Sequence, residues 1–296
     1  DVYDVTVTAS DGTLSSTKAV AITVSNVNEA PTITSAATAS FAENGSGTVY
    51  TAAASDPDAG ATLTYSISGA DASLFNIDAT TGVVTFKSSP NFEAPGDAGG
   101  NNVYDVKVTA SDGTLSSSKD VAITVVNAND APTASAVIAN QSINEDAGFS
   151  FAVPASSFAD ADAGDSLTLS ATLADGSPLP AWLSFNPATQ TFSGTPLNDD
   201  VGSLSIRVTA TDTSGASATQ DFQVTVHNTN DGPVVSVAIA DQSANEDAGF
   251  SFSVAPGSFT DVDAGDSLTY SASLADGSPL PAWLSWQERL RSPPAR

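Results

Sequence analysis

Residues 3–15 read Tyr3-Asp-Val-Thr-Val-Thr-Ala-Ser-Asp-Gly-Thr-Leu-Ser15, and nearly the same stretch returns as Tyr104-Asp-Val-Lys-Val-Thr-Ala-Ser-Asp-Gly-Thr-Leu-Ser116. In both copies apolar and polar side chains alternate, which is typical of a β-strand with one buried face. The Asp-Gly pair that follows favours a tight hairpin turn. The stretch therefore predicts an antiparallel hairpin, and its two copies lie 101 residues apart.

The offset of 101 residues recurs along the chain. The stretch 24–31 returns as 125–132 and again as 226–233, and 138–185 returns with scattered changes as 239–286. A fixed period of this kind marks tandem repeats. Because the apolar residues alternate within each repeat and no stretch keeps a helical spacing, we predict the all-β class, as tandem Greek-key β-sandwich repeats of about 100 residues.

The repeat boundaries are expected at the recurring Asn-x-Asn-acid-x-Pro stretches, because proline ends strand pairing. The predicted parts are the C-terminal end of one repeat in 1–30, two whole repeats in 31–131 and 132–232, and a truncated repeat in 233–296. Residues 287–296 depart from the repeat and hold three of the eight basic residues. We interpret them as the product of a frame shift or sequencing break, and a genuine C-terminus is the alternative.

The charge balance limits the class of partner. The chain has 34 acidic and 8 basic residues and a net charge of −26, which argues against nucleic acid and anionic lipid as partners and favours cations. Cysteine is absent, so disulfides cannot stabilise the repeats and a metal could. No apolar run approaches the length of a membrane-spanning helix, and we expect any signal or anchor to lie outside these residues.

Acidic and amide side chains gather in three kinds of motif. A first-strand glutamate, an Asn-x-Asn-acid linker and an Asp-x-Asp pair in the next repeat recur together. Calcium takes six to eight hard oxygen ligands, which these motifs supply. The alternative is that the aspartates only cap turns and stay solvated.

Residues 31–131 resemble a bacterial cadherin repeat, and 132–232 resemble the dystroglycan-type cadherin-like repeat, with its Phe192-Ser-Gly-Thr-Pro and Ala210-Thr-Asp motifs. The resemblance implies a cadherin/immunoglobulin-like sandwich from a large surface adhesin. It also implies calcium ions between consecutive repeats, held by a first-strand glutamate, an aromatic-Glu motif, the linker and the next repeat.

Carried over residue by residue, the resemblance implies three calcium sites. The first is formed by Asn28, Glu29, Asp56, Asp58 and Asp112. The second, and most complete, is formed by Glu43, Glu93, Asn127, Asn129, Asp130, Asp160, Asp162 and Asp212. The third is formed by Glu145, Asn230, Asp231, Asp261 and Asp263.

Several residues depart from the family pattern. Asn26, Asn127 and Asn228 stand where the family linker begins with aspartate, and Asn91 and Glu29 also differ. Fewer charges predict weak affinity, roughly 10⁻⁴ to 10⁻³ M as in other extracellular modules. The third repeat has no aromatic-Glu motif, and the stretch 198–200 occupies comparable ground.

The expected function is a calcium-rigidified stalk or a cell-adhesion segment, homophilic or heterophilic, at the surface of a bacterium or secreted by it. The expected partners are calcium ions, neighbouring repeats of the chain, and a protein or glycan on another cell; membrane insertion by this segment is not expected. The alternative is a carbohydrate-binding module of a secreted hydrolase. Trp182 and Trp283 are expected to pack in the core or at an edge, although exposed aromatics would favour that alternative. An enzyme is not expected, because no catalytic constellation is visible and His227 is the only histidine.

Overall fold

The computed structural model describes residues 1–287 of the chain. Apart from Gln287, the stretch interpreted as a frame-shift product lies outside the described residues. Within 1–287 the regular structure consists of β-strands and three short 3₁₀ helices, η1 (Ala72–Leu74), η2 (Ala155–Ser157) and η3 (Asn198–Asp200). The predicted all-β class is therefore confirmed.

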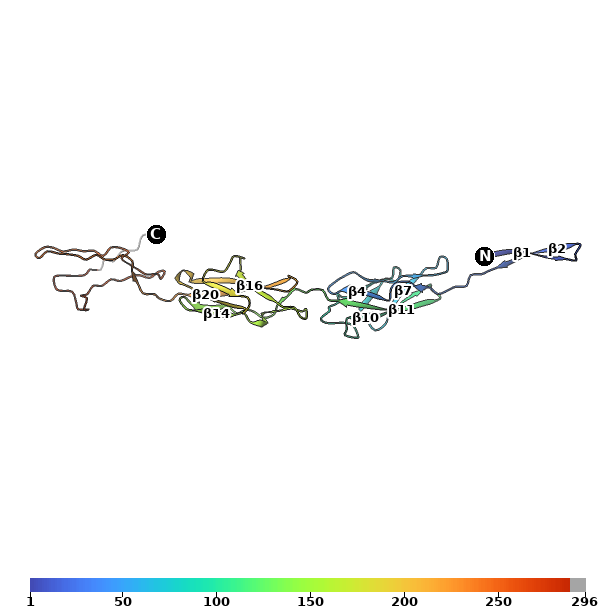
Figure 1. Cartoon of the computed structure of the whole chain (residues 1–296), viewed down its shortest axis with the longest axis horizontal. Helices are drawn as coiled ribbons and strands as arrows, with labels where there is room; N and C mark the ends of the chain where they lie inside the picture. Colours follow the sequence, from blue (N-terminus) through green and yellow to red (C-terminus); the bar gives the residue numbers. More distant parts are fainter. Residues whose placement is uncertain (288–296) are drawn as a thin grey trace. The chain divides into compact units, whose positions relative to one another are not determined.

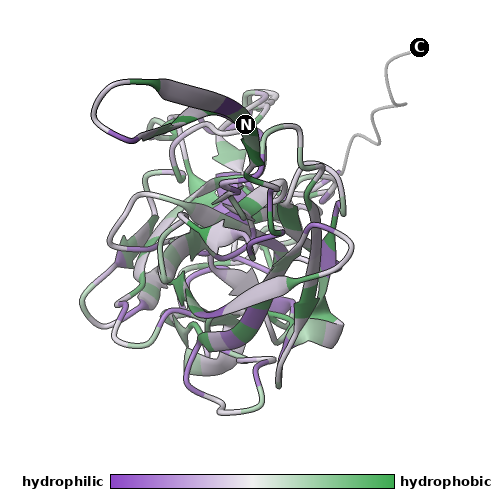
Figure 2. Cartoon of the chain, turned by 90° about the vertical axis from the view of Figure 1, so that its right-hand side faces the viewer, coloured by the Kyte–Doolittle hydropathy of each residue, from purple (hydrophilic) through white to green (hydrophobic). Residues whose placement is uncertain are grey.

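The chain divides into two compact units. The first contains Asp1–Asp130 together with Ala161–Gly164, and the second contains Ala131–Asp160 and the chain from Asp165 onward. Figure 2 shows hydrophobic segments in green on many strands and hydrophilic segments in purple at many loops. Among the described residues there is no helix with the length and hydrophobicity that a membrane span requires.

The first unit opens with the hairpin that its sequence predicts. Strand β1 (Val2–Ser10) pairs antiparallel with β2 (Ser15–Thr23), as Figure 1 shows near the N-terminus. The turn is held by Asp11, whose Oδ1 accepts hydrogen bonds from the N–H groups of Thr13 at 2.9 Å and Leu14 at 2.8 Å. Gly12 occupies the left-handed region at φ 97°, which a glycine adopts without strain.

A β-sandwich follows in residues 32–126. One sheet has the order β4 (Thr38–Ala42), β11 (Ser116–Val126), β10 (Val103–Ser111) and β7 (Thr64–Ser68), with β4 parallel to β11. The other has the order β5 (Thr48–Thr51), β9 (Val83–Phe86) and β8 (Phe75–Ile77). A short pair joins β3 (Thr32–Ile33) to β6 (Ala54–Ser55). The alternating apolar residues of both sheets meet in one core, which includes Phe75, Val84, Val108 and Ile123.

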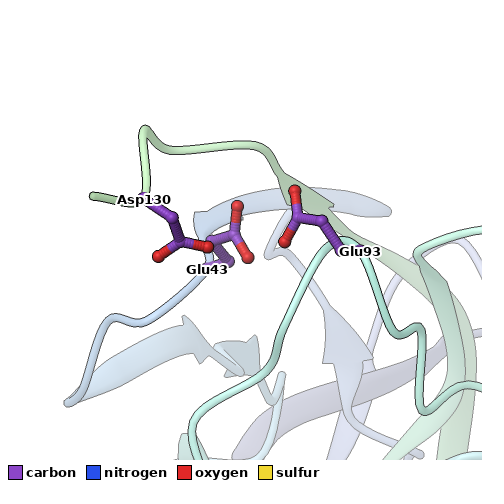
Figure 3. Close-up of side chains that lie close together, drawn as sticks. All are labelled: Glu43, Glu93 and Asp130. Atoms are coloured by element: carbon purple, nitrogen blue, oxygen red, sulfur yellow. The ribbon is translucent and has the colours of Figure 1, made fainter. Parts of the chain in front are cut away.

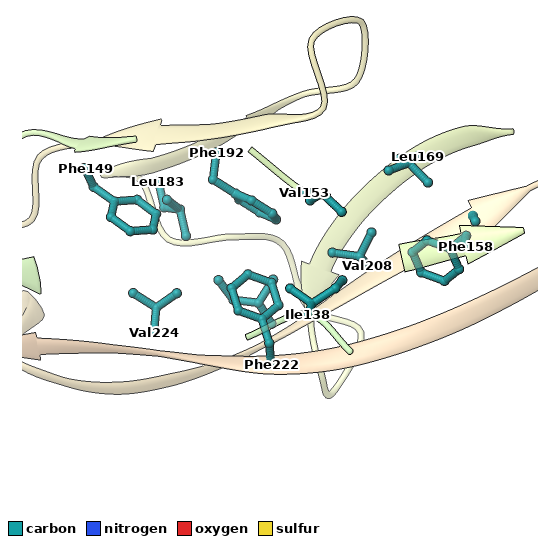
Figure 4. Packing of buried hydrophobic residues seen from close by; sticks show 12 residues of the cluster. Ile138, Phe149, Val153, Phe158, Leu169, Leu183, Phe192, Val208, Phe222 and Val224 are labelled. Carbon is teal, nitrogen blue, oxygen red and sulfur yellow. The ribbon is translucent and has the colours of Figure 1, made fainter. Parts of the chain in front are cut away.

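The second unit repeats this arrangement. One sheet has the order β13 (Gln141–Asn144), β20 (Ser217–His227), β19 (Gly202–Thr211) and β16 (Thr168–Leu173), with β13 parallel to β20. The other has the order β14 (Phe149–Ala152), β18 (Thr191–Gly194) and β17 (Leu183–Asn186), and β12 (Thr133–Ala134) pairs with β15 (Phe158–Ala159). Figure 4 shows the core between them, with Phe192 and Phe222 in edge-to-face contact at 5.5 Å.

The last stretch of the second unit has little regular structure. Between residue 233 and residue 287 the strands are β21 (Val234–Val235) and β22 (Phe259–Thr260), which pair antiparallel. Several of its large apolar side chains are exposed, among them Trp283 at 72%. Trp182, at the equivalent position one repeat earlier, packs against the core and meets the ring of Phe149 at 6.3 Å.

Candidate metal centres

Parallel pairing places two acidic segments at the same edge of the first sandwich. Ala42 at the end of β4 pairs with Val126 at the end of β11, so Glu43 and the linker that follows residue 126 leave the sheet together. Glu93 comes from the loop between β9 and β10. Carboxylate oxygens of Glu43, Glu93 and Asp130 lie within 4.8 Å of one another. Figure 3 shows these three side chains close together.

Glu43 anchors this cluster. Its side chain is only 2% exposed, and its two oxygens accept hydrogen bonds from the N–H groups of Phe92 at 2.6 Å and Ala128 at 2.9 Å. Asp130 accepts a further hydrogen bond from the side-chain amide of Asn44 at 2.9 Å. The glutamate therefore ties the 92–93 loop and the linker to one point, which orients all three carboxylates.

Glu93 lacks the partners that Glu43 has. Its Oε2 is buried and accepts no hydrogen bond from the described residues. Burial and the negative charges of Glu43 and Asp130 raise the pKa of Glu93 above its usual range. An unpaired buried carboxylate oxygen is costly, and a hard cation would relieve both the desolvation and the repulsion. The donor set therefore fits a calcium ion.

The second aspartate of every Asp-x-Asp pair is held by the preceding linker. Asp162 accepts hydrogen bonds from the Asn127 side-chain amide at 2.8 Å and from the Asp130 N–H at 2.7 Å. Asp263 accepts them from the Asn228 amide at 2.9 Å and the Asp231 N–H at 2.6 Å. Asp58 likewise accepts from the Asn26 amide and, at 2.8 Å, from the Glu29 N–H. These donors lower the pKa values of Asp58 and Asp263.

The first linker brings together the residues expected around it. Asn28 donates its amide to Asp112 at 2.8 Å. Asp56 accepts a hydrogen bond from the N–H of Asp58 at 2.8 Å through Oδ1, whereas its Oδ2 is buried and unpartnered. Burial and the charges of Asp58 and Asp56 raise the pKa of Glu29. The carboxylates of Glu29, Asp56 and Asp58 therefore repel one another at this edge.

The third linker has its own buried glutamate. Glu145 is 2% exposed, and its Oε1 accepts the Thr229 N–H at 2.7 Å. Its Oε2 is buried and accepts no hydrogen bond from residues 1–287. Carboxylate oxygens of Asp261, Asp263 and Asp266 lie within 4.8 Å of one another. Asn230 donates its amide to the carbonyl oxygen of Asp231, as Asn129 does to that of Asp130, both at 2.9 Å.

Two further expected ligands, Asp160 and Asp212, lie in the second unit. Asp160 and Asp165 have carboxylate oxygens within 4.8 Å of each other. Asp165 accepts the Thr213 hydroxyl at 2.9 Å through Oδ1, and its Oδ2 is buried without a hydrogen bond. The neighbouring Asp212 is 7% exposed and accepts the N–H groups of Ser214 and Ala216.

Three residues in these clusters were not expected from the sequence, and a fourth, Asn198, belongs to a stretch whose role the sequence leaves open. Asp165 and Asp266 follow the Asp-x-Asp pairs in a Gly-Asp-Ser stretch that recurs at the 101-residue offset, whereas Ala61 stands at the equivalent place in the earlier repeat. That recurrence was a usable signal. Asn44 contacts Asp130, and Asn198 of η3 donates its amide to Asp263 at 3.3 Å. Asn198 lies in the stretch that stands in place of an aromatic-Glu motif.

Of the two tryptophans at equivalent repeat positions, one packs as expected and the other is exposed. The expected core packing holds for Trp182, whereas it is wrong for Trp283, whose side chain is 72% exposed. The strands around them differ: Trp182 directly precedes β17, which pairs with β18, and no equivalent pair forms among the described residues after 233.

A family model described as "Putative Ig domain" matches residues 131–227 and 232–289, together just over half of the chain. No curated protein matches the sequence. Solved structures share the fold at low identity. The PcdhgB3 EC1-4 structure is 21% identical, with a TM-score of 0.52 over 77% of this chain and 57% of that one.

Two further structures are similar at lower TM-scores. Protocadherin gamma B2 extracellular cadherin domains 3-6 are 22% identical, with a TM-score of 0.46 over 77% of this chain and 60% of that one. Human protocadherin-24 EC1-2 is 19% identical, with a TM-score of 0.49 over 68% of this chain and 100% of that one.

Proposed function

Because the chain belongs to this family of Ig domains, we propose that it is a calcium-binding segment whose ions, held at the linkers between β-sandwich repeats, stiffen part of an extracellular stalk or adhesion protein. For the repeats we propose the boundaries expected from the sequence: 1–30, 31–131, 132–232 and 233–296.

The observation that carries this proposal is the cluster of Glu43, Glu93 and Asp130. Three carboxylates converge within 4.8 Å, and the buried Oε2 of Glu93 has no hydrogen-bond donor. Like charges at this separation repel one another strongly in a partly buried site. Bound calcium would supply the positive charge that this cluster lacks, and its preference for hard oxygen ligands matches the donors present.

Recurrence along the chain supports the same function. Glu145 also has a buried, unpartnered oxygen beside a linker, and Asp56 has one at the first linker. Asp160 and Asp165 follow the second linker as Asp261 and Asp266 follow the third, and in each pair carboxylate oxygens lie within 4.8 Å of each other. This recurrence favours a repeated binding role over a local accident of turn chemistry.

Residues of the chain would couple calcium binding to ordering of the linker. Glu43 binds the linker at Ala128 and the loop at Phe92, so any cation held by its carboxylate also fixes those segments. Free energy of cation binding then stabilises the ordered linker relative to a mobile one. Such coupling suits a stalk, in which a string of sandwiches must resist bending.

The proposed cellular location and partners are based on the fold. The likeness to PcdhgB3 EC1-4 supports a cadherin-like sandwich as the building unit, and this chain covers 57% of that structure. We propose an extracellular or cell-surface location in a bacterium, calcium and neighbouring repeats as partners, and a protein or glycan of another surface as the target of the parent protein. No catalytic role is proposed.

The test is calcium titration of the full chain by calorimetry, with thermal unfolding and small-angle scattering in chelator, in millimolar calcium and in millimolar magnesium. Calcium should bind, raise the melting temperature and stiffen the particle, and magnesium should do so far less. The double variant Glu43→Gln with Glu93→Gln should abolish calcium binding at the cluster of Glu43, Glu93 and Asp130. The control pair Asp4→Asn with Asp105→Asn removes the same charge from exposed strand positions. No calcium binding by the wild type would refute the proposal.

A further inference from the structure

The asparagine that opens each linker forms the same pair of contacts three times. In each linker its side-chain amide donates to Oδ1 of the second aspartate of the Asp-x-Asp pair, and the backbone N–H three residues later donates to Oδ2 of the same aspartate. The three sets are Asn26 and Glu29 with Asp58, Asn127 and Asp130 with Asp162, and Asn228 and Asp231 with Asp263.

We propose that Asn26, Asn127 and Asn228 act as metal-free clamps, which hold each linker on the following Asp-x-Asp loop when calcium is absent and weaken calcium binding when it is present. The second half of this inference rests on the proposed calcium function, and the first half does not. The clamp is defined as the asparagine amide, the N–H three residues later and the aspartate that accepts both.

The geometry makes the clamp specific. Both oxygens of one carboxylate are engaged by donors on a four-residue stretch, at 2.8 and 2.7 Å for Asp162 and at 2.9 and 2.6 Å for Asp263. Asp162 and Asp263 are 8% and 6% exposed, so water competes weakly for these bonds. Hydrogen bonds from two donors to a charged acceptor are stronger than those between neutral groups.

The side chain at the first linker position decides whether the linker is ordered without a cation or binds a cation more tightly. An asparagine donates to the carboxylate, whereas an aspartate at the same place would put two carboxylates 2.8 Å apart at residues 127 and 162. With a net charge of −26, the chain gains from every junction that orders itself without adding a negative charge. The cost is one carboxylate fewer for a cation, because calcium affinity rises with the charge of its ligands.

The clamp does not exclude a cation. An ionised carboxylate offers about four lone-pair sites, and the amide and the N–H of the clamp use two of them. Both donors of the clamp belong to the chain, so its two bonds form without a metal.

The experiment is amide hydrogen exchange of the full chain by NMR in excess chelator, read at the N–H groups of Glu29, Asp130 and Asp231. Wild-type amides at these positions should be protected. Asn127→Asp should speed exchange at Asp130 alone by about tenfold or more, the effect expected from losing charge-assisted bonds and adding repulsion. Calorimetry of the same variant should show tighter calcium binding, whereas Asn127→Ala should lose protection without that gain.

The control is Asn76→Asp, which adds the same charge at an exposed strand position. Thermal unfolding of each variant shows whether the sandwiches remain folded. Unprotected wild-type amides in chelator, or an Asn127→Asp variant with unchanged protection, would overturn the clamp even if calcium binds. Protected amides in a chain that binds no calcium would leave the metal-free clamp standing and refute the proposed calcium function.

Discussion

A Cβ atom on Gly194 would overlap the backbone carbonyl oxygen of Trp182. Gly194 ends β18 and pairs with Phe149 of β14 on one side and with Leu183 of β17 on the other. The chain therefore passes Trp182 at a distance that only a hydrogen side chain allows. This close approach gives a physical role to the glycine of the Ser-Gly-Thr-Pro motif.

Gly194→Ala should lower the free energy of unfolding of the second unit by about 1–3 kcal/mol, because the added methyl group forces the two backbones apart. Chemical denaturation followed by tryptophan fluorescence measures the change. Gly148→Ala is the matched control, since nothing lies within 4 Å of its added methyl group. Equal stability of the two variants would show that β17 and β18 can separate without cost.

Residues Ile22 and Ile123 occupy equivalent positions one repeat apart but differ in burial. Ile123 is fully buried, whereas Ile22 is 50% exposed on the hairpin β1–β2. Ile123→Ala should cost about 2–5 kcal/mol of unfolding free energy. Ile22→Ala should change it by no more than about 0.5 kcal/mol. Urea unfolding of both variants tests the pair, and a similar cost at both positions would mean that the hairpin packs against another part of the molecule.

Asp97 predicts a loss of stability in acid. Burial raises the pKa of Asp97, but the N–H groups of Asn101 at 3.1 Å and Asn102 at 3.0 Å outweigh it and leave the pKa below its usual range. A lowered folded-state pKa means that this stabilisation is complete above the unfolded value of about 3.9 and is lost as the pH falls through the folded value.

Asp97→Asn should therefore lower the melting temperature at neutral pH and have little effect near pH 2. Melting curves between pH 2 and pH 7 check the difference, with Asp105→Asn as an exposed control. A difference between variant and wild type that stays constant over this range would show that the charge of Asp97 does not contribute.

The alternation of apolar residues was enough to predict the strands, because burial on one face of a sheet imposes a period of two. The alternation could not predict in which copy of a repeated strand the apolar side chains are buried. Tyr3 and Tyr104 lie in nearly identical stretches, yet Tyr3 is 56% exposed and Tyr104 only 3%. The difference depends on whether a second sheet covers the strand, and the sequence of the strand does not contain that information.

The carboxylate clusters could be predicted from the sequence to a similar extent. The parallel pairing of β4 and β11 brings Glu43 to the linker, and the family pattern anticipates that meeting. The amide contacts of Asn44 and Asn198 were not anticipated, because they depend on loop paths and side-chain rotamers with no periodic signature. The linker asparagines were noticed only as missing charges, whereas their contacts show them as hydrogen-bond donors.

Glu145 predicts effects of opposite sign with and without calcium. Its Oε1 accepts the Thr229 N–H, whereas its buried Oε2 has no partner. In chelator this charge is costly, because an ionised group without a full set of partners is penalised in a buried site. Under the proposed function the same oxygen is a ligand in calcium, and a buried carboxylate that binds a cation should stabilise the linker.

Glu145→Gln should therefore raise the melting temperature of the second unit in chelator and lower it in millimolar calcium. Calcium affinity at that linker should fall about tenfold or more, the loss expected when a charged contact is replaced by a neutral one. Glu246→Gln is the matched control, because Glu246 is the equivalent glutamate 101 residues later and is exposed. Calorimetry and thermal unfolding of both variants give the result. A variant less stable than wild type in chelator as well as in calcium would show that Glu145 serves the fold through its hydrogen bond to Thr229 and not the cation.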